Sequence, residues 1–173
     1  MSGSKLPFRL QILAVALLAA LGWVVADSAV QKIVETGDKA PNFRIVTDNG
    51  RTITRSNFGG KVLVLNFWAT WCPPCIQEIP SLDAMQRKMA GDGVVVVAVS
   101  VDKNEKAYRD FLSRARVSFL TARDPEADVS SIYGTFKYPE TYIINRDGKV
   151  VAKHISDQNW LDEGILRDIR AAL

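Results

Sequence analysis

The chain has 173 residues, of which 47% are apolar and 24% are charged, with a formal net charge of +3 at pH 7. That apolar fraction is ordinary for a globular core. Lys5 and Arg9 supply most of the excess charge, because without them twenty basic residues face nineteen acidic ones. There is no basic run and no mixed aromatic and basic patch, so the composition gives no indication of a nucleic-acid partner.

The N-terminal part of the chain contains an uncharged apolar stretch of seventeen residues, 10–26. This length is at the short limit of a membrane-spanning helix and at the long limit of the apolar region of a signal peptide. Positive charge before it and Asp27 after it predict that the N-terminus stays inside and that the rest is exported. We expect residues 1–27 to be an uncleaved signal anchor with Trp23 at the interface. The alternative is a signal peptide that is cleaved after Ala26.

Residues 28–40 are expected to be a connector, and residues 41–173 a single domain, since about 130 residues suit one compact unit. Within it, short alternating runs flank Asp48-Asn49-Gly50, which predicts a β-hairpin. A second hairpin is expected around 145–149. The long apolar runs 62–65 and 94–101 are typical of buried parallel strands.

The other elements follow from apolar spacing and from the position of turn residues. Strands are expected at 43–46, 52–54, 62–65, 94–101, 119–122, 142–144 and 150–152. Helices are expected at 76–89, 105–114, 128–133 and 160–173. This order predicts an α/β fold with a central mixed β-sheet flanked by helices.

The two cysteines of the chain, Cys72 and Cys75, lie between the strand at 62–65 and the following helix. A CxxC pair at such a junction places the first sulfur at a helix N-terminus, where unpaired N–H groups and the dipole favour the thiolate. The thiolate is the reactive form in disulfide exchange. Pro73 and Pro74 suit the first helical turn, where their missing N–H groups have no partner to lose. The pattern predicts a redox-active dithiol.

A structural disulfide and a zinc site both fit the cysteine pair less well. A purely structural disulfide across two residues would close a very small loop and stabilise the fold little. A zinc site requires four ligands, and besides the cysteines the chain offers one distant histidine, His154. His154 is expected to be a strand residue with no chemical role, and no cofactor is expected.

Three blocks in order carry a resemblance to a known family: Gly37 to Phe43, Asn66 to Cys75 and Tyr138 to Asn145. Together they resemble the TlpA/ResA-like branch of the thioredoxin superfamily. The proteins of this branch are membrane-anchored thiol-disulfide oxidoreductases. The resemblance covers residues 37–173 and implies a thioredoxin-like fold with an added N-terminal β-hairpin. The first block is shared with peroxiredoxins, but neither cysteine has the Pro-x-x-x-Thr/Ser-x-x-Cys context of a peroxidase.

The resemblance also implies roles for individual residues. The Tyr138–Pro139 bond is expected to be cis and packed against the cysteines, as a ledge for a substrate segment near Cys72. Six residues are expected to contact substrate: Trp71, Pro73, Pro74, Tyr138, Pro139 and Glu140. Glu140 is expected to tune the cysteine pair or to contact a partner. The alternative is that Glu140 has no special role.

Glu78 is the candidate for proton transfer. Thioredoxins carry a buried Asp immediately before Phe-Trp, where this chain has Asn66, which cannot accept a proton. Glu78 follows Cys75 by three residues on the same helical face, and its side chain leans toward the helix N-terminus. The resembling proteins use a Glu at the matching position, so we expect Glu78 to exchange protons with Cys75. A solvated surface Glu remains the alternative.

The expected function is reduction of substrate disulfides outside the cytoplasm. Cys72 attacks the substrate, and Cys75 resolves the mixed disulfide. Electrons would come from a membrane dithiol donor, and the resemblance implies the CxxCH pair of exported apocytochrome c as substrate. The alternative is a reductant or chaperone for copper-site assembly of cytochrome oxidase, although the CxxxC spacing of copper-binding relatives is absent.

Overall fold

The computed structural model describes residues 7–28 and 33–173, and the chain divides into two units at residues 32 and 33. The first unit contains helix α1, Phe8–Ser28. In the part of the chain that is described, no helix has the length and apolar character needed to cross a membrane. The anchor at residues 1–27 stays a prediction.

The second unit begins at Ile33, earlier than the predicted domain boundary. Val34 and Ala40 are 3% and 2% exposed, and the Val34 N–H donates to the Tyr133 carbonyl at 3.1 Å. Residues 33–40 of the predicted connector thus pack onto the domain, and residues 29–32 lie outside the described part.

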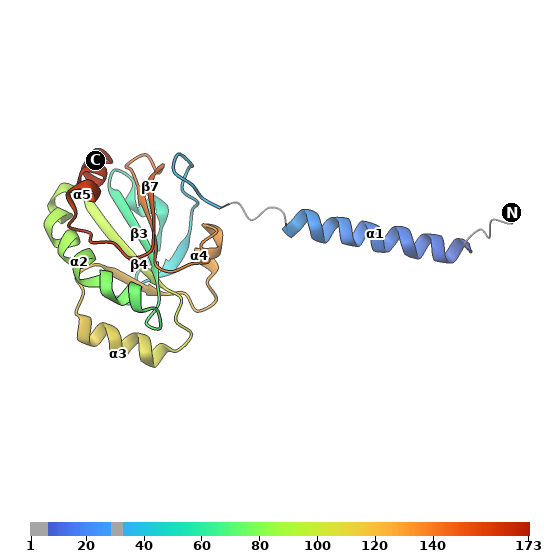
Figure 1. Cartoon of the computed structure of the whole chain (residues 1–173), viewed down its shortest axis with the longest axis horizontal. Coiled ribbons are helices and arrows are strands. Elements are labelled where there is room, and N and C mark those ends of the chain that lie inside the picture. The colour runs from blue at the N-terminus through green and yellow to red at the C-terminus, as the bar shows by residue number, and fades with distance from the viewer. Residues whose placement is uncertain (1–6, 29–32) are drawn as a thin grey trace. The chain divides into compact units, whose positions relative to one another are not determined.

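A five-stranded mixed sheet forms the centre of this unit, with the order β5-β4-β3-β6-β7 (Figure 1). Its strands are β3 (Val62–Trp68), β4 (Val94–Ser100), β5 (Leu120–Arg123), β6 (Glu140–Ile144) and β7 (Val150–Ile155). Strands β3, β4 and β5 run parallel, whereas β6 and β7 pair in antiparallel fashion. All seven residues of β3 are buried, as expected for a central strand covered on both faces.

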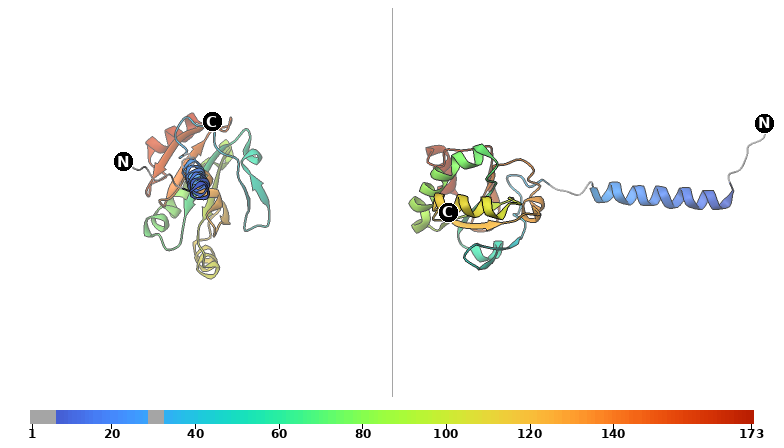
Figure 2. Two further views of the ribbon diagram at one scale, coloured as in Figure 1. Left: turned by 90° about the vertical axis from the view of Figure 1, so that its right-hand side faces the viewer. Right: turned by 90° about the horizontal axis from the view of Figure 1, so that it is seen from below.

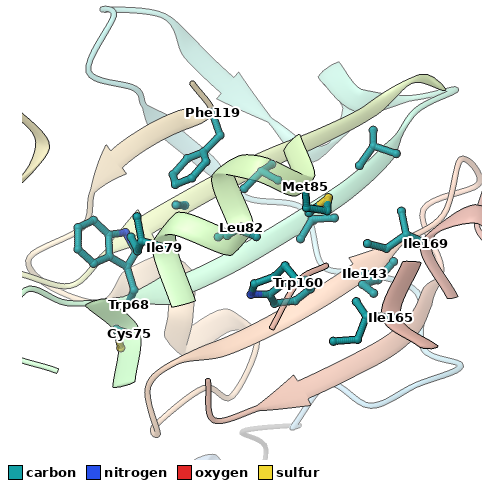
Figure 3. Packing of buried hydrophobic residues seen from close by; sticks show 14 of the residues in the cluster. Trp68, Cys75, Ile79, Leu82, Met85, Phe119, Ile143, Trp160, Ile165 and Ile169 are labelled. Atoms are coloured by element: carbon teal, nitrogen blue, oxygen red, sulfur yellow. The ribbon is translucent and has the colours of Figure 1, made fainter. Parts of the chain in front are cut away.

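Helices pack on the two faces of the sheet and create two hydrophobic cores. They are α2 (Pro73–Met89), α3 (Glu105–Ala115), α4 (Asp128–Ile132) and α5 (Glu163–Ala171). One core joins the sheet to α2 and α5 and contains Leu82, Ile143 and Trp160 (Figure 3). The other core lies on the opposite face and contains Phe43, Phe67 and Tyr142.

A two-stranded antiparallel sheet, β1 (Arg44–Val46) and β2 (Thr52–Thr54), is added before β3. It lies on the side of the main sheet away from α2 and α5 (Figure 2). Asp48 in its turn accepts hydrogen bonds from Tyr108 Oη at 2.5 Å and from Thr121 Oγ1 at 2.6 Å, which tie the hairpin to α3 and β5. Short 3-10 helices, η1 (Arg55–Phe58) and η2 (Ala90–Asp92), complete the fold.

These elements confirm the predicted thioredoxin-like fold and most of its predicted boundaries. The last helix differs, because α5 begins at Glu163 instead of residue 160. Asp162 caps it by accepting a hydrogen bond from the Gly164 N–H at 2.7 Å. Trp160 precedes the helix as a fully buried loop residue.

Candidate active site

The cysteine pair lies at the junction between β3 and α2, and its two sulfurs form a disulfide. Cys72 is the N-cap residue of α2, and its Sγ accepts a hydrogen bond from the Cys75 N–H at 3.3 Å. Cys72 is 6% exposed and Cys75 is fully buried. A partner approaching from solvent therefore reaches Cys72 first, while Cys75 is shielded by the helix.

The turn that leads into Cys72 is held by a buried carboxylate. Asp102 is 1% exposed and accepts hydrogen bonds from Thr70 N at 2.9 Å and from Thr70 Oγ1 at 2.6 Å. Ser100 Oγ donates to the same carboxylate at 2.6 Å. Because Thr70 is two residues before Cys72, these hydrogen bonds fix the backbone that leads into Cys72.

The expected cis peptide bond between Tyr138 and Pro139 is present, and it lies beside the disulfide. The Tyr138 carbonyl oxygen is 3.5 Å from Cys72 Sγ. The Trp71 ring is 62% exposed and packs edge-on against the Tyr138 ring at 6.0 Å between centroids. Pro73 and Pro74 are exposed next to them, and Pro139 is buried. Five of the six predicted substrate contacts therefore lie around the sulfurs: Trp71, Pro73, Pro74, Tyr138 and Pro139.

Glu140 is the exception among the predicted contacts. It is 4% exposed, and its Oε1 accepts from Lys153 Nζ at 2.9 Å and from Tyr142 Oη at 3.1 Å. Along β6 it alternates with Thr141, whose hydroxyl faces Asn66, so Glu140 points to the opposite face of the sheet. A side chain so deeply buried is not available for direct contact with a substrate.

Glu78 lies inside the protein, which excludes the surface alternative, because only 2% of it is exposed. Its Oε1 accepts a hydrogen bond from Asn66 Nδ2 at 2.8 Å. Its Oε2 accepts from Gln158 N at 3.2 Å and from Trp160 Nε1 at 3.1 Å. The carboxylate is thus held from β3 on one side and from the loop after β7 on the other.

Burial raises the pKa of Glu78 from 4.5 to about 7, because it removes water from the charged form. The hydrogen bonds from Trp160, Asn66 and Gln158 act in the other direction, since they stabilise the carboxylate. A group with a pKa near 7 both accepts and donates protons at neutral pH. The arrangement suits proton exchange with Cys75, one turn earlier on α2.

Trp68 and His154 both occupy structural positions. Trp68 is fully buried beneath α2 and α3, with its ring 5.1 Å from that of Phe111. His154 lies on β7 against Trp160, and burial lowers its pKa. Among the described residues, no group of three or more His, Cys, Asp and Glu side chains is placed to hold a metal ion.

Comparison with known proteins agrees with this geometry. Residues 35–169 match the Redoxin family. The chain is 32% identical to the thiol-disulfide oxidoreductase ResA of Bacillus thuringiensis subsp. konkukian over 160 residues, 91% of this chain and 92% of that protein. It is 36% identical to ResA of Bacillus subtilis over 137 residues, 78% of this chain and 76% of that protein. This chain belongs to the Redoxin family.

Among solved structures, a DsbE-like thiol:disulfide interchange protein of Chlorobium tepidum superimposes with a TM-score of 0.75 and 34% identity. That match covers 80% of this chain and 98% of the other. With its ResA relatives and its CxxC pair in a thioredoxin-like fold, the chain is a thiol-disulfide oxidoreductase.

Two groups that shape the site, Asp102 and Trp160, are not predicted from the sequence. Asp102 follows the apolar run of β4, and Trp160 reads as part of the apolar face of the last helix. Both contact the site across more than thirty residues of chain, and no local pattern marks such contacts. A carboxylate directly after a central strand is the one weak signal that could have indicated Asp102.

Proposed function

We propose that this chain is an exported reductase that opens disulfides in partner proteins through Cys72 and Cys75, with Glu78 as the proton carrier. The observation that carries the proposal is the unequal placement of the three groups. Cys72, at a helix N-terminus, keeps 6% of its surface exposed, whereas Cys75 is fully buried and Glu78 is 2% exposed further along the same helix. This order matches a nucleophile, a resolving thiol and a base.

In the first step the reduced Cys72 thiolate attacks one sulfur of a substrate disulfide, and the other substrate sulfur leaves as a thiolate. The helix N-terminus and the Cys75 N–H stabilise negative charge on Cys72 Sγ. The exposed Trp71 ring, the half-buried Tyr138 ring and the backbone at Tyr138 offer a surface for the substrate segment beside the sulfur. The product is a mixed disulfide.

In the second step Cys75 loses its proton to Glu78 and attacks Cys72 Sγ. The second substrate sulfur leaves as a thiolate, so the substrate gains two electrons and the Cys72–Cys75 disulfide forms. Glu78 then returns its proton to solvent or to the leaving thiolate. A dithiol donor restores the reduced pair by the same steps in reverse.

We propose the CxxCH segment of apocytochrome c as the substrate, in keeping with the family resemblance. The apolar segment at 10–26, with positive charge before it, supports export of the domain. An oxidising compartment requires a dedicated donor to keep such a dithiol reduced, and we propose a membrane dithiol protein for that role. A copper-site protein is the second candidate substrate, since the same exchange chemistry would serve it.

Trapping experiments test the proposal. Cys75→Ser is expected to accumulate mixed disulfides with exported proteins on gels run without reductant, because the resolving thiol is gone. Cys72→Ser is the matched control and is expected to trap none. Equal trapping by both variants would show that the nucleophile is wrongly assigned.

A peptide assay tests the substrate class. The reduced protein is mixed with an oxidised CxxCH peptide and with a peptide of the same composition spaced CxxxC. Faster reduction of the first is expected. A clear preference for the second would favour the copper-site alternative.

A further inference from the structure

The loop between β7 and α5, residues 156–162, reaches back to the middle of α2. Gln158 N and Trp160 Nε1 both donate to Glu78 Oε2, at 3.2 and 3.1 Å. On the next turn of the helix, Ser81 Oγ donates to Gln158 O at 3.3 Å and accepts from Trp160 N at 3.2 Å. The loop is therefore joined to α2 at two successive positions, and one of them is the carboxylate.

Trp160 combines this contact with a fixed position in the core. Its side chain is fully buried, and it packs in the same cluster as Leu82 and Ile143 (Figure 3). His154 lies edge-on against it, with ring centroids 5.6 Å apart. A rigid ring packed in this way has no freedom to turn its N–H elsewhere, so the donor stays aimed at Glu78 Oε2.

We propose that Trp160 is a positioning residue for Glu78, and that its indole N–H stabilises the ionised carboxylate and keeps it in one orientation. The inference rests on the proposed role of Glu78 as proton carrier for Cys75. Hydrogen bonds to the charged form of an acid favour that form. Trp160 thus opposes the effect of burial, which by itself would leave Glu78 protonated and unable to accept a proton from Cys75.

Other charged groups surround this contact and must be considered in any pH experiment. Cys75 lies one turn before Glu78 on α2. Asp157 on the loop raises the pKa of Glu78 by charge repulsion. His154 on β7 packs against Trp160, and Asp168 on α5 interacts with His154. A Trp160 variant that leaves these groups in place isolates the effect of the indole N–H.

The test is a direct titration of Glu78 in the oxidised protein, where the cysteines do not titrate. The full chain is labelled with ¹³C at glutamate carboxyl carbons, and Glu78→Gln assigns the Glu78 resonance. Trp160→Phe keeps the apolar ring and removes the N–H. We expect the pKa of Glu78 to rise by about one pH unit, a tenfold change in its ionisation constant.

Trp68→Phe is the matched control, because Trp68 is also fully buried while its Nε1 has no hydrogen-bond partner among the described residues. We expect it to leave the pKa of Glu78 unchanged. An unchanged pKa in Trp160→Phe, or an equal rise in both variants, would overturn the inference.

The pH dependence of mixed-disulfide resolution separates this inference from the proposed function. If Glu78 carries the proton, Trp160→Phe is expected to move the midpoint of the rate profile upward by the same amount as the titration. A moved titration with an unmoved rate profile would uphold the positioning role and refute the catalytic role of Glu78.

Discussion

The amide of Asn66 on β3 donates to Glu78 Oε1 at 2.8 Å, so an amide supports the carboxylate from the strand side of the site. The same Nδ2 group donates to Thr141 Oγ1 on β6 at 2.8 Å, which fixes its orientation. An amide side chain does not exchange protons near neutral pH. Of these two side chains, only Glu78 can therefore carry out the proposed proton exchange, and the residues around it supply donors.

Replacing Glu78 is expected to change the pH dependence of the resolving step. The pKa of Glu78 is about 7, so the wild-type rate should show an inflection near that pH. Glu78→Gln should lose the inflection and slow resolution by about a hundredfold at neutral pH. Stopped-flow measurement of mixed-disulfide decay across the neutral range measures both quantities.

Glu126→Gln serves as the control for that experiment, because Glu126 is an exposed carboxylate on the loop before α4. Its profile should coincide with that of the wild type. Since Cys75 and Glu78 interact, the fitted midpoints belong to the pair of groups. If the pH–rate profile of Glu78→Gln coincided with that of the wild type, Glu78 would have a structural role and no catalytic one.

Glu78 should also make stability depend on pH. Its pKa is raised in the folded protein, so the folded state keeps a proton that the unfolded state loses above about pH 4.5. This contribution to the free energy of unfolding is fully present below that pH and is lost as the pH rises to about 7. The loss is on the order of 3 kcal/mol. In urea unfolding of the oxidised proteins, the free energy of unfolding of the wild type should fall by that amount relative to that of Glu78→Gln as the pH rises across this range. A constant difference would contradict the raised pKa.

Asp102 should control the turn before the nucleophile. Asp102→Asn weakens the acceptor for two Thr70 donors and places an amide against them, so it should cost about 1–3 kcal/mol of stability. We also expect slower alkylation of Cys72 in the reduced protein, measured with iodoacetamide below the unfolding transition. The comparison variant is Asp110→Asn, which changes an exposed carboxylate on α3. Unaltered stability and alkylation in Asp102→Asn would refute the anchoring role.

The ion pair between Glu140 and Lys153 should be structural. Their side chains are 5% and 8% exposed and meet at 2.9 Å, so loss of one partner leaves a buried charge. Lys153→Met is expected to cost about 3 kcal/mol, and the double variant with Glu140→Gln to cost less than the single one. Urea unfolding of the wild type, of each single variant and of the double variant decides this. Strictly additive effects would show that the two groups do not interact.

Much of this fold was predictable because its signals are local. The apolar runs of β3 and β4 and the turn at Asn49-Gly50 each depend on neighbouring residues. The same holds for Cys75 and Glu78, whose separation of three residues places them on one helical face whatever the rest of the chain does. Such features can be predicted without knowledge of any tertiary contact.

The remainder depends on tertiary packing. Trp160 meets Glu78 across 82 residues, and nothing in its own neighbourhood indicates a hydrogen bond to that carboxylate. Glu140 was misplaced for a different reason, since adjacency to Pro139 suggested the active site while strand alternation sends its side chain to the other face.

The N-cap of α2 is the sulfur of Cys72 itself, which accepts from the Cys75 N–H. Most helices begin on a side-chain oxygen, whereas in the proposed cycle this helix begins on an atom that alternates between a thiolate and a neutral disulfide sulfur. The charge on Cys72 Sγ should therefore alter the hydrogen bond donated by the Cys75 N–H. The NMR chemical shift of the Cys75 amide should therefore change with the redox and ionisation state of Cys72, and no attached probe is needed to observe it.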